Sequence, residues 1–127
     1  MVILASNLGQ NIDEAFRRRI HVVVEFPFPD ESERLRLWKN MFAPDIGRPS
    51  DDELATLVKF RLAGGNIRNI VVDAGFRAPH GGMQPLTITL EHLVLSIARE
   101  YQKLGKPITR GEFGEPFFTW IQDNRIL

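Results

Sequence analysis

The amino-acid sequence predicts a mainly α-helical protein with a small α/β segment at its N-terminal end. Two short segments, the apolar run of residues 2–5 and the valine-rich residues 21–26, are typical of strands. After Pro29, apolar side chains instead repeat at spacings of three and four residues as far as residue 104, which is typical of amphipathic helices. The composition permits this fold, because 43% of the 127 residues are hydrophobic, enough for the core of one domain.

The N-terminal segment has the pattern of an incomplete sheet. Residues 2–5 form a short apolar run that ends in Ser-Asn, as a buried strand of a parallel sheet does. Residues 12–19 are predicted to form a short helix. Residues 21–26, with three consecutive β-branched valines, are predicted to form a second strand that ends at Pro27. Because two strands do not make a stable sheet alone, we expect the neighbouring strands to come from other polypeptide.

Capping signals mark the start of the first two helices of the following region. Asp30 and Glu33 have the spacing of a capping box, and Ser50 and Glu53 repeat it. The apolar face predicted for the first helix consists of Leu35, Trp38, Met41 and Phe42, and that of the second consists of Leu54, Leu57, Val58 and Leu62.

Two further helices are predicted from glycine and cap positions. Gly64-Gly65 are expected to end the second helix and Asn66 to cap the third, while Thr89 caps the fourth and Gly105 stops it. The buried faces are predicted to be Ile67, Ile70, Val71 and Ala74 in the third helix, and Leu90, Leu93, Val94, Ile97, Tyr101 and Leu104 in the fourth. A loop rich in proline and glycine, residues 79–85, joins them. Residues 106–127 are rich in aromatic side chains, so we expect this tail to pack against another surface.

Charge and composition argue against several classes of function. Sixteen Lys and Arg balance sixteen Asp and Glu, so no overall field favours nucleic acid or an anionic membrane. The sequence has no cysteine, and His21, His80 and His92 lack companions at zinc-site spacing, so no metal site is expected. The first residues have neither a basic region nor a long apolar run, so a cytoplasmic protein without signal peptide or membrane span is expected.

Several motifs, in their order along the chain, resemble those of AAA+ ATPases. Leu4–Asn7, Ile12–Arg19 and Glu25–Asp30 resemble the second region of homology of this family, and Gly64–Asn69 resembles its sensor 2 motif. The resemblance implies that residues 1–29 are the C-terminal remnant of the nucleotide-binding core, with its last two strands. It also implies that residues 30–105 are the four-helix lid and residues 106–127 a C-terminal tail. Since Met1 directly precedes the implied fourth core strand, we expect the chain to be a fragment of the ATPase module.

The resemblance places sensor 1 at Asn7. A carboxamide both donates and accepts, so it can hold an attacking water near a γ-phosphate without adding charge. An asparagine that merely turns the chain at a strand end is the alternative for this residue taken alone.

The resemblance also implies an arginine finger among Arg17, Arg18 and Arg19. A guanidinium group is permanently charged and binds phosphate oxygens with two donors, so it can stabilise charge in a neighbouring subunit's site. The family's spacing favours Arg18 and Arg19 over Arg17, although Ile20-His21 departs from what usually follows the finger. Three adjacent arginines could alternatively be a solvated face.

At the sensor 2 position the resemblance implies that Arg68 reaches the phosphates of bound ATP, with Gly64, Gly65 and Asn66 forming the surrounding turn. The start of a helix favours an anion through its backbone dipole and free amide groups. The alternatives are a surface arginine and a pair of glycines that permit a tight turn between helices.

The sequence lacks the residues that would complete an ATPase site. No Gly-x-x-x-x-Gly-Lys-Ser/Thr motif occurs, and Glu25 is followed by Phe26 instead of forming an Asp-Glu pair for magnesium. We therefore expect the complete protein, and not this chain by itself, to bind Mg-ATP and turn it over, in a ring of identical subunits. One alternative is a non-enzymatic helical adaptor that binds an AAA+ ATPase at its subunit interface. A small nucleic-acid binder that uses the arginine run is a weaker alternative.

Overall fold

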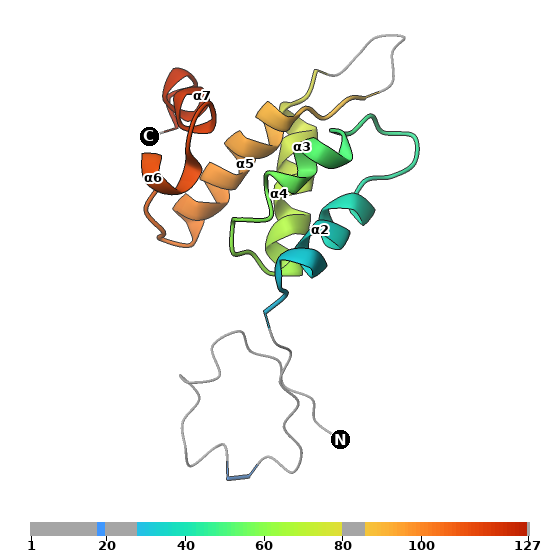
Figure 1. The fold of residues 1–127 in the computed structure, drawn as a ribbon, viewed down its shortest axis with the longest axis vertical. Helices are drawn as coiled ribbons and strands as arrows, with labels where there is room; N and C mark the ends of the chain where they lie inside the picture. The colour runs from blue at the N-terminus through green and yellow to red at the C-terminus, as the bar shows by residue number, and fades with distance from the viewer. Residues whose placement is uncertain (1–17, 20–27, 80–85, 127) are drawn as a thin grey trace.

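A computed structural model describes residues 18–19, 28–79 and 86–126 of the chain (Figure 1). Within these residues the structure is mainly helical, as predicted, with a single parallel bridge between Gly47 and Thr87 as its only extended pairing. The two predicted strands, the greater part of the predicted helix 12–19 and most of the loop 79–85 lie outside the described residues.

The first two described helices begin where their capping signals predict. Helix α2 is Glu31–Asn40 and α3 is Asp51–Ala55. Asp30 and Ser50 each accept a hydrogen bond from the backbone of the residue three positions on, whose glutamate side chain accepts one in return. This reciprocal arrangement satisfies amide groups that a helix start leaves unpaired. Trp38 is fully buried, and the other predicted face residues pack against the core that contains it, which confirms that face, although Met41 and Phe42 lie just beyond the end of α2.

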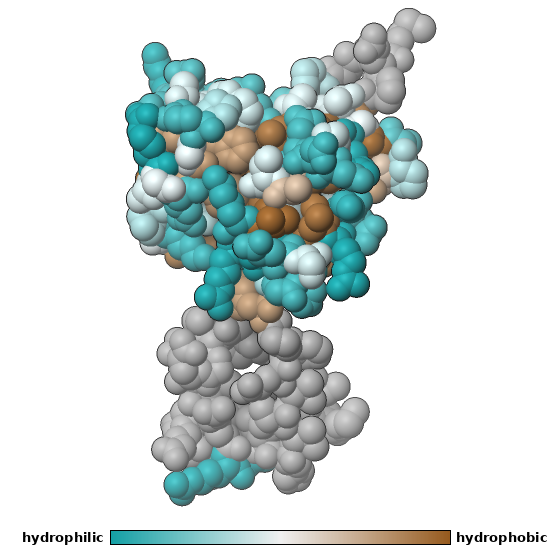
Figure 2. Space-filling model, viewed as in Figure 1, coloured by the Kyte–Doolittle hydropathy of each residue, from teal (hydrophilic) through white to brown (hydrophobic). Residues whose placement is uncertain are grey.

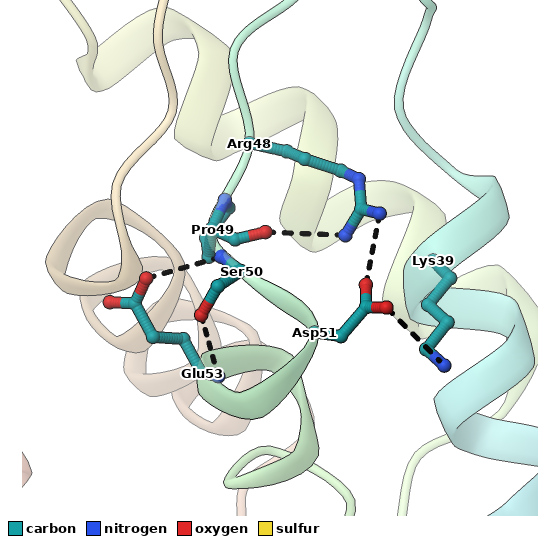
Figure 3. A network of polar contacts seen from close by, with 6 residues as sticks. All are labelled: Lys39, Arg48, Pro49, Ser50, Asp51 and Glu53. Carbon is teal, nitrogen blue, oxygen red and sulfur yellow. Dashed lines mark hydrogen bonds and ion pairs between the residues drawn. The ribbon is translucent and has the colours of Figure 1, made fainter.

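A small polar network joins the end of α2 to the start of α3 (Figure 3). Asp51 lies 3.0 Å from the guanidinium of Arg48 and 3.8 Å from the amino group of Lys39. Both ion pairs are partly exposed, so each stabilises the fold only slightly. Their main consequence is to keep the two helix ends together.

Helix α3 is shorter than predicted. The apolar spacing predicted a helix as far as Leu62, but α3 ends at Ala55 and tighter turns follow, in which most amides bond to the carbonyl three residues back. Thr56 contributes to this end, because its hydroxyl donates to the Glu53 carbonyl at 2.6 Å. Leu57 and Leu62 are nevertheless fully buried, whereas Val58 is only half-buried.

The central pair of helices is α4 (Gly64–Arg77) and α5 (Leu90–Lys103), and α5 lies between α4 and the C-terminal helices (Figure 1). Thr89 caps α5 as predicted, and His92 completes that cap by accepting from the Thr89 amide at 3.0 Å. Gly105 ends α5 with φ +70°, and the following amide bonds back to Tyr101, as in a Schellman motif. Leu104, predicted to continue the buried face, is instead 48% exposed because the helix has already ended there.

The C-terminal tail packs, as predicted, and does so against α5 and Phe60 through α6 (Arg110–Phe113) and α7 (Phe117–Asp123). Phe113, Phe117 and Ile121 are buried in the same hydrophobic core as the earlier helices. The Tyr101 hydroxyl donates to Glu112 at 2.6 Å, and burial together with this carboxylate raises the pKa of Tyr101. The core is therefore continuous across residue 105, where the sequence analysis divides lid from tail.

One face of the described bundle is largely polar. Figure 2 shows this face, on which hydrophilic residues surround a few separate hydrophobic areas. No helix in the described part of the chain is long and apolar enough to cross a membrane.

Candidate functional site

The residues to which the resemblance gives a role in phosphate sensing form two groups along the chain. The first group is Asn7 and the arginines 17–19. Asn7 and Arg17 lie outside the described residues, so their predicted roles have no geometry here. Arg18 and Arg19 form an exposed turn. The second group, Gly64, Gly65, Asn66 and Arg68, lies together in the first two turns of α4.

Helix α4 begins three residues earlier than predicted. Gly64 and Gly65 are its first residues and do not end the preceding helix, while Ala63 takes the N-cap position with φ −82° and ψ 165°. Asn66 is consequently not the cap: its Oδ1 accepts from the Ala63 amide at 3.0 Å from within the first turn. Alanine has no side-chain acceptor, so the start of α4 lacks a side-chain cap and has no acidic residue in its first turn.

The structure does not require glycine at either position of this first turn. Neither Gly64 nor Gly65 has a positive φ, so the tight-turn explanation for this pair is wrong. A Cβ at Gly64 would make ordinary contact with Leu37 at 3.9 Å, and at Gly65 it would meet nothing within 4 Å. Glycine lowers helix stability relative to alanine, so the pair weakens α4 without relieving a clash among the described residues. Its remaining advantage is to let another molecule approach the backbone closely.

Asn66 is held by a neighbour that sequence reasoning missed. Its Nδ2 donates to Glu100 of α5 at 3.3 Å, and Asn69 donates to the same carboxylate oxygen at 3.4 Å. Glu100 is only 5% exposed, and its other oxygen lies 3.9 Å from the Lys103 amino group. A charge buried to this degree requires such partners. Asn66 therefore joins α4 to α5. The sequence feature that could have indicated this contact is Glu100 itself, a carboxylate three residues after Ile97 on the buried face of α5.

Arg68 is the residue of this group that remains available. Arg68 is exposed, and its side chain forms no hydrogen bond or ion pair with the rest of the described chain. With Asn69, Val72, Asp73, Phe76 and Lys103 it lines a shallow depression between α4 and the end of α5. An unpaired guanidinium group in such a depression is suited to bind an anion.

The single carboxylate in this depression is already neutralised. Asp73 lies 3.1 Å from the Arg77 guanidinium on the next turn of α4. Burial acts to raise the pKa of Asp73, but hydrogen bonds from Ser96 and Arg77 outweigh it and hold the pKa below its ordinary value. Asp73 therefore stays paired with Arg77, and the charge that the depression presents to a ligand is positive.

Two large apolar side chains on α4 face solvent, and the sequence analysis did not single them out. Val72 is 52% exposed and Phe76 is 77% exposed. They follow Arg68 at intervals of four residues and so share its face of the helix. An exposed apolar stripe of this kind is a common feature of surfaces that bind another protein.

Other types of site have less support. Residues 18–19, 28–79 and 86–126 contain no group of three or more His, Asp or Glu that could hold a metal ion. His92 serves as part of a helix cap, while His21 and His80 lie outside these ranges. Comparison of the chain with known protein families, curated proteins and solved structures gives no match.

Proposed function

We propose that this chain is the C-terminal part of an AAA+ ATPase module, in which the start of α4 binds the phosphates of ATP when the helical bundle closes on the core. The order of the motifs in residues 4–69 supports this assignment. So does the mainly helical fold, whose helices α2 to α5 follow Asp30 in the number and order that the four-helix lid requires.

The main support for the proposal is that the first residues of α4 lack a capping side chain. An alanine cap and two glycines leave its backbone amides open, and Arg68 is exposed without a partner in the described chain. Free amides at a helix start and a guanidinium group are both ligands for phosphate. In this arrangement Arg68 would contact the nucleotide of its own subunit.

Arg18 and Arg19 have the other role in this proposal. One of them, with Arg19 the first choice for a test, would act as the arginine finger in the site of the neighbouring subunit in a ring of identical subunits, and Asn7 would orient the attacking water. Walker A and Walker B residues and the magnesium ligands would come from preceding polypeptide, so this chain alone would not hydrolyse ATP. The proposed location of the machine is the cytoplasm.

The test is a pair of substitutions in an ATP-binding form of the protein, that is, this chain extended by the polypeptide encoded upstream in the same reading frame. Arg19→Ala should lower turnover by on the order of 10³ to 10⁵ while leaving nucleotide affinity nearly unchanged, because a finger acts on the transition state of another subunit. Arg68→Ala should instead weaken nucleotide binding. Equal loss of binding and turnover in Arg19→Ala would contradict the finger role, and unchanged affinity and rate in Arg68→Ala would make Arg68 an ordinary surface residue.

The exposed stripe of Val72 and Phe76 favours a second candidate function. In this alternative the chain is a helical adaptor without activity of its own, which binds an AAA+ ATPase at its subunit interface and donates Arg18 or Arg19 or blocks the site. The adaptor would bind an intact ATPase and change its turnover. Val72→Ser with Phe76→Ser should abolish that binding, whereas a chain that binds no ATPase would remove the alternative.

A further inference from the structure

The chain enters the helical bundle through a buried arginine. Arg34 lies in the first turns of α2 and is only 7% exposed. A buried guanidinium group is costly unless its donors are satisfied, and among the described residues its side chain has no carboxylate partner. Its partners are instead two backbone carbonyl groups.

These two carbonyl groups come from segments on opposite sides of α2 in the sequence. Arg34 Nη1 donates to the Pro29 carbonyl at 2.6 Å, directly before α2, and Nε donates to the Val58 carbonyl at 2.8 Å, in the turns after α3. Hydrogen bonds in which one partner is charged are roughly twice as strong as neutral ones. Arg34 therefore ties the entry of the chain to the far side of the α2–α3 pair.

A second arginine strengthens the same connection. The Arg61 guanidinium lies over the Phe28 ring, 5.2 Å from its centre, although Phe28 is 52% exposed. Pro29 adds its own restriction, because its ring fixes φ. Residues 28–30 are thus held to residues 58–61 by two contacts. Pro29 is joined to Val58 through Arg34, and Phe28 contacts Arg61 directly.

We propose that Arg34, aided by Arg61, makes Phe28–Asp30 part of the rigid helical bundle and so acts as a positioning residue. The predicted boundary between core remnant and lid lies between residues 29 and 30, where a flexible link would be the simplest expectation. The contacts of Arg34 with Pro29 and Val58 and of Arg61 with Phe28 together form what we call the clamp. The clamp excludes residues 29 and 30 as the point of bending. Only the consequence rests on the proposed ATPase function: movement of the preceding core would be transmitted to the bundle through a stiff connection.

The test is backbone amide relaxation measured by NMR on the 127-residue chain, without nucleotide. In the unmodified chain the order parameters of Phe28 and Asp30 should be about 0.85, like those of α2. Arg34→Met keeps an unbranched stem but removes the donors, and the order parameter of Phe28 should fall below about 0.6. Arg36→Met removes an exposed arginine from the same helix and should leave Phe28 unchanged.

The variants also separate the clamp from general stability. In Arg34→Met the order of α4 and α5 should stay at its original value, since the clamp lies outside their contact. Arg61→Ala should lower the order of Phe28 less than Arg34→Met does. If Arg34→Met unfolds the bundle, Arg34→Lys decides, because one amino group cannot serve both carbonyls in the same geometry and partial loss of order at Phe28 is expected.

Two results would overturn the proposal. The first is a Phe28 amide that is already mobile in the unmodified chain. The second is a Phe28 amide that keeps its full order in Arg34→Met, or in Arg34→Lys if Arg34→Met unfolds. Neither result depends on ATP. Failure of the clamp and failure of the ATPase assignment are therefore distinguishable.

Discussion

The start of α4 differs from the starts of α2, α3 and α5. Asp30, Ser50 and Thr89 each accept a backbone hydrogen bond at their helix start, and each cap is completed by the side chain three residues on. Ala63 has nearly the same extended backbone as these three caps but no side chain that can accept. Since the backbone is suited to a capping residue, the missing cap at α4 is a property of the side chain and not of the fold.

The difference shows where stability and ligand binding place opposite demands on a sequence. A capping side chain satisfies the first amides of a helix and thereby occupies the position where an anion would bind. The α4 start has neither a capping side chain nor a Cβ on its first two residues. Its first amides are thus not capped by a side chain, at some loss of stability, and the proposed phosphate site supplies a reason for that loss.

Leu93→Ala should have the largest effect on stability, because Leu93 is fully buried in the core to which both α4 and α5 contribute. The free energy of unfolding, measured by urea denaturation, should fall by about 2–5 kcal/mol. Val72→Ala on the exposed face of α4 is the control and should change it little. An unchanged stability in Leu93→Ala would mean that α4 and α5 do not share a core, and the comparison of their starts would lose its basis.

A pair of cap substitutions should give opposite effects of similar size. Ser50→Ala removes the cap of α3 and should destabilise the chain by about 1 kcal/mol. Ala63→Ser adds a hydroxyl acceptor where the backbone already suits it, and should stabilise the chain by up to a similar amount. Urea denaturation checks both, and a destabilising Ala63→Ser would show that the α4 start is not a vacant cap.

Gly65→Ala should have the smallest effect. No described atom lies within 4 Å of the added Cβ and φ is not positive, so stability should rise by about 0.4–1 kcal/mol, mainly through loss of freedom in the unfolded chain. Gly105→Ala is the matched control, since φ of +70° there should make the same change destabilising. A destabilised Gly65→Ala would point to a structural need for glycine at this position after all.

The sequence was informative where local rules decide the structure. The caps at Asp30, Ser50 and Thr89 and the stop at Gly105 depend on a few adjacent residues, and all four were predicted. The end of α3 was not, because turns after Ala55 bring Phe60 into contact with the distant Phe113. Helices α6 and α7 are too short for a periodic pattern, so the tail was predicted to pack but its helices were not.

In the candidate site, too, the residues of a local motif were predicted, whereas contacts between helices were not. Arg68 and the two glycines were identified by their motif, and they do lie together at one helix start. The role of Asn66 was not foreseen, because Glu100 comes from another helix and its burial depends on how α4 and α5 pack. Arg34 was missed for a related reason: it is a charged residue whose partners are carbonyl groups, which leave no pattern in the sequence.

Phosphate binding at the α4 start is tested most directly by the affinity for Mg-ATP, measured by calorimetric titration, of the ATP-binding form of the protein carrying Ala63→Asp. An aspartate at this cap should stabilise α4 while its charge repels phosphate from the same amides, so we expect a more stable protein that binds ATP at least about tenfold more weakly. Ser50→Asp at the start of α3 should leave the affinity unchanged. If Ala63→Asp binds ATP as tightly as the unmodified protein, the open start of α4 is not where phosphate binds.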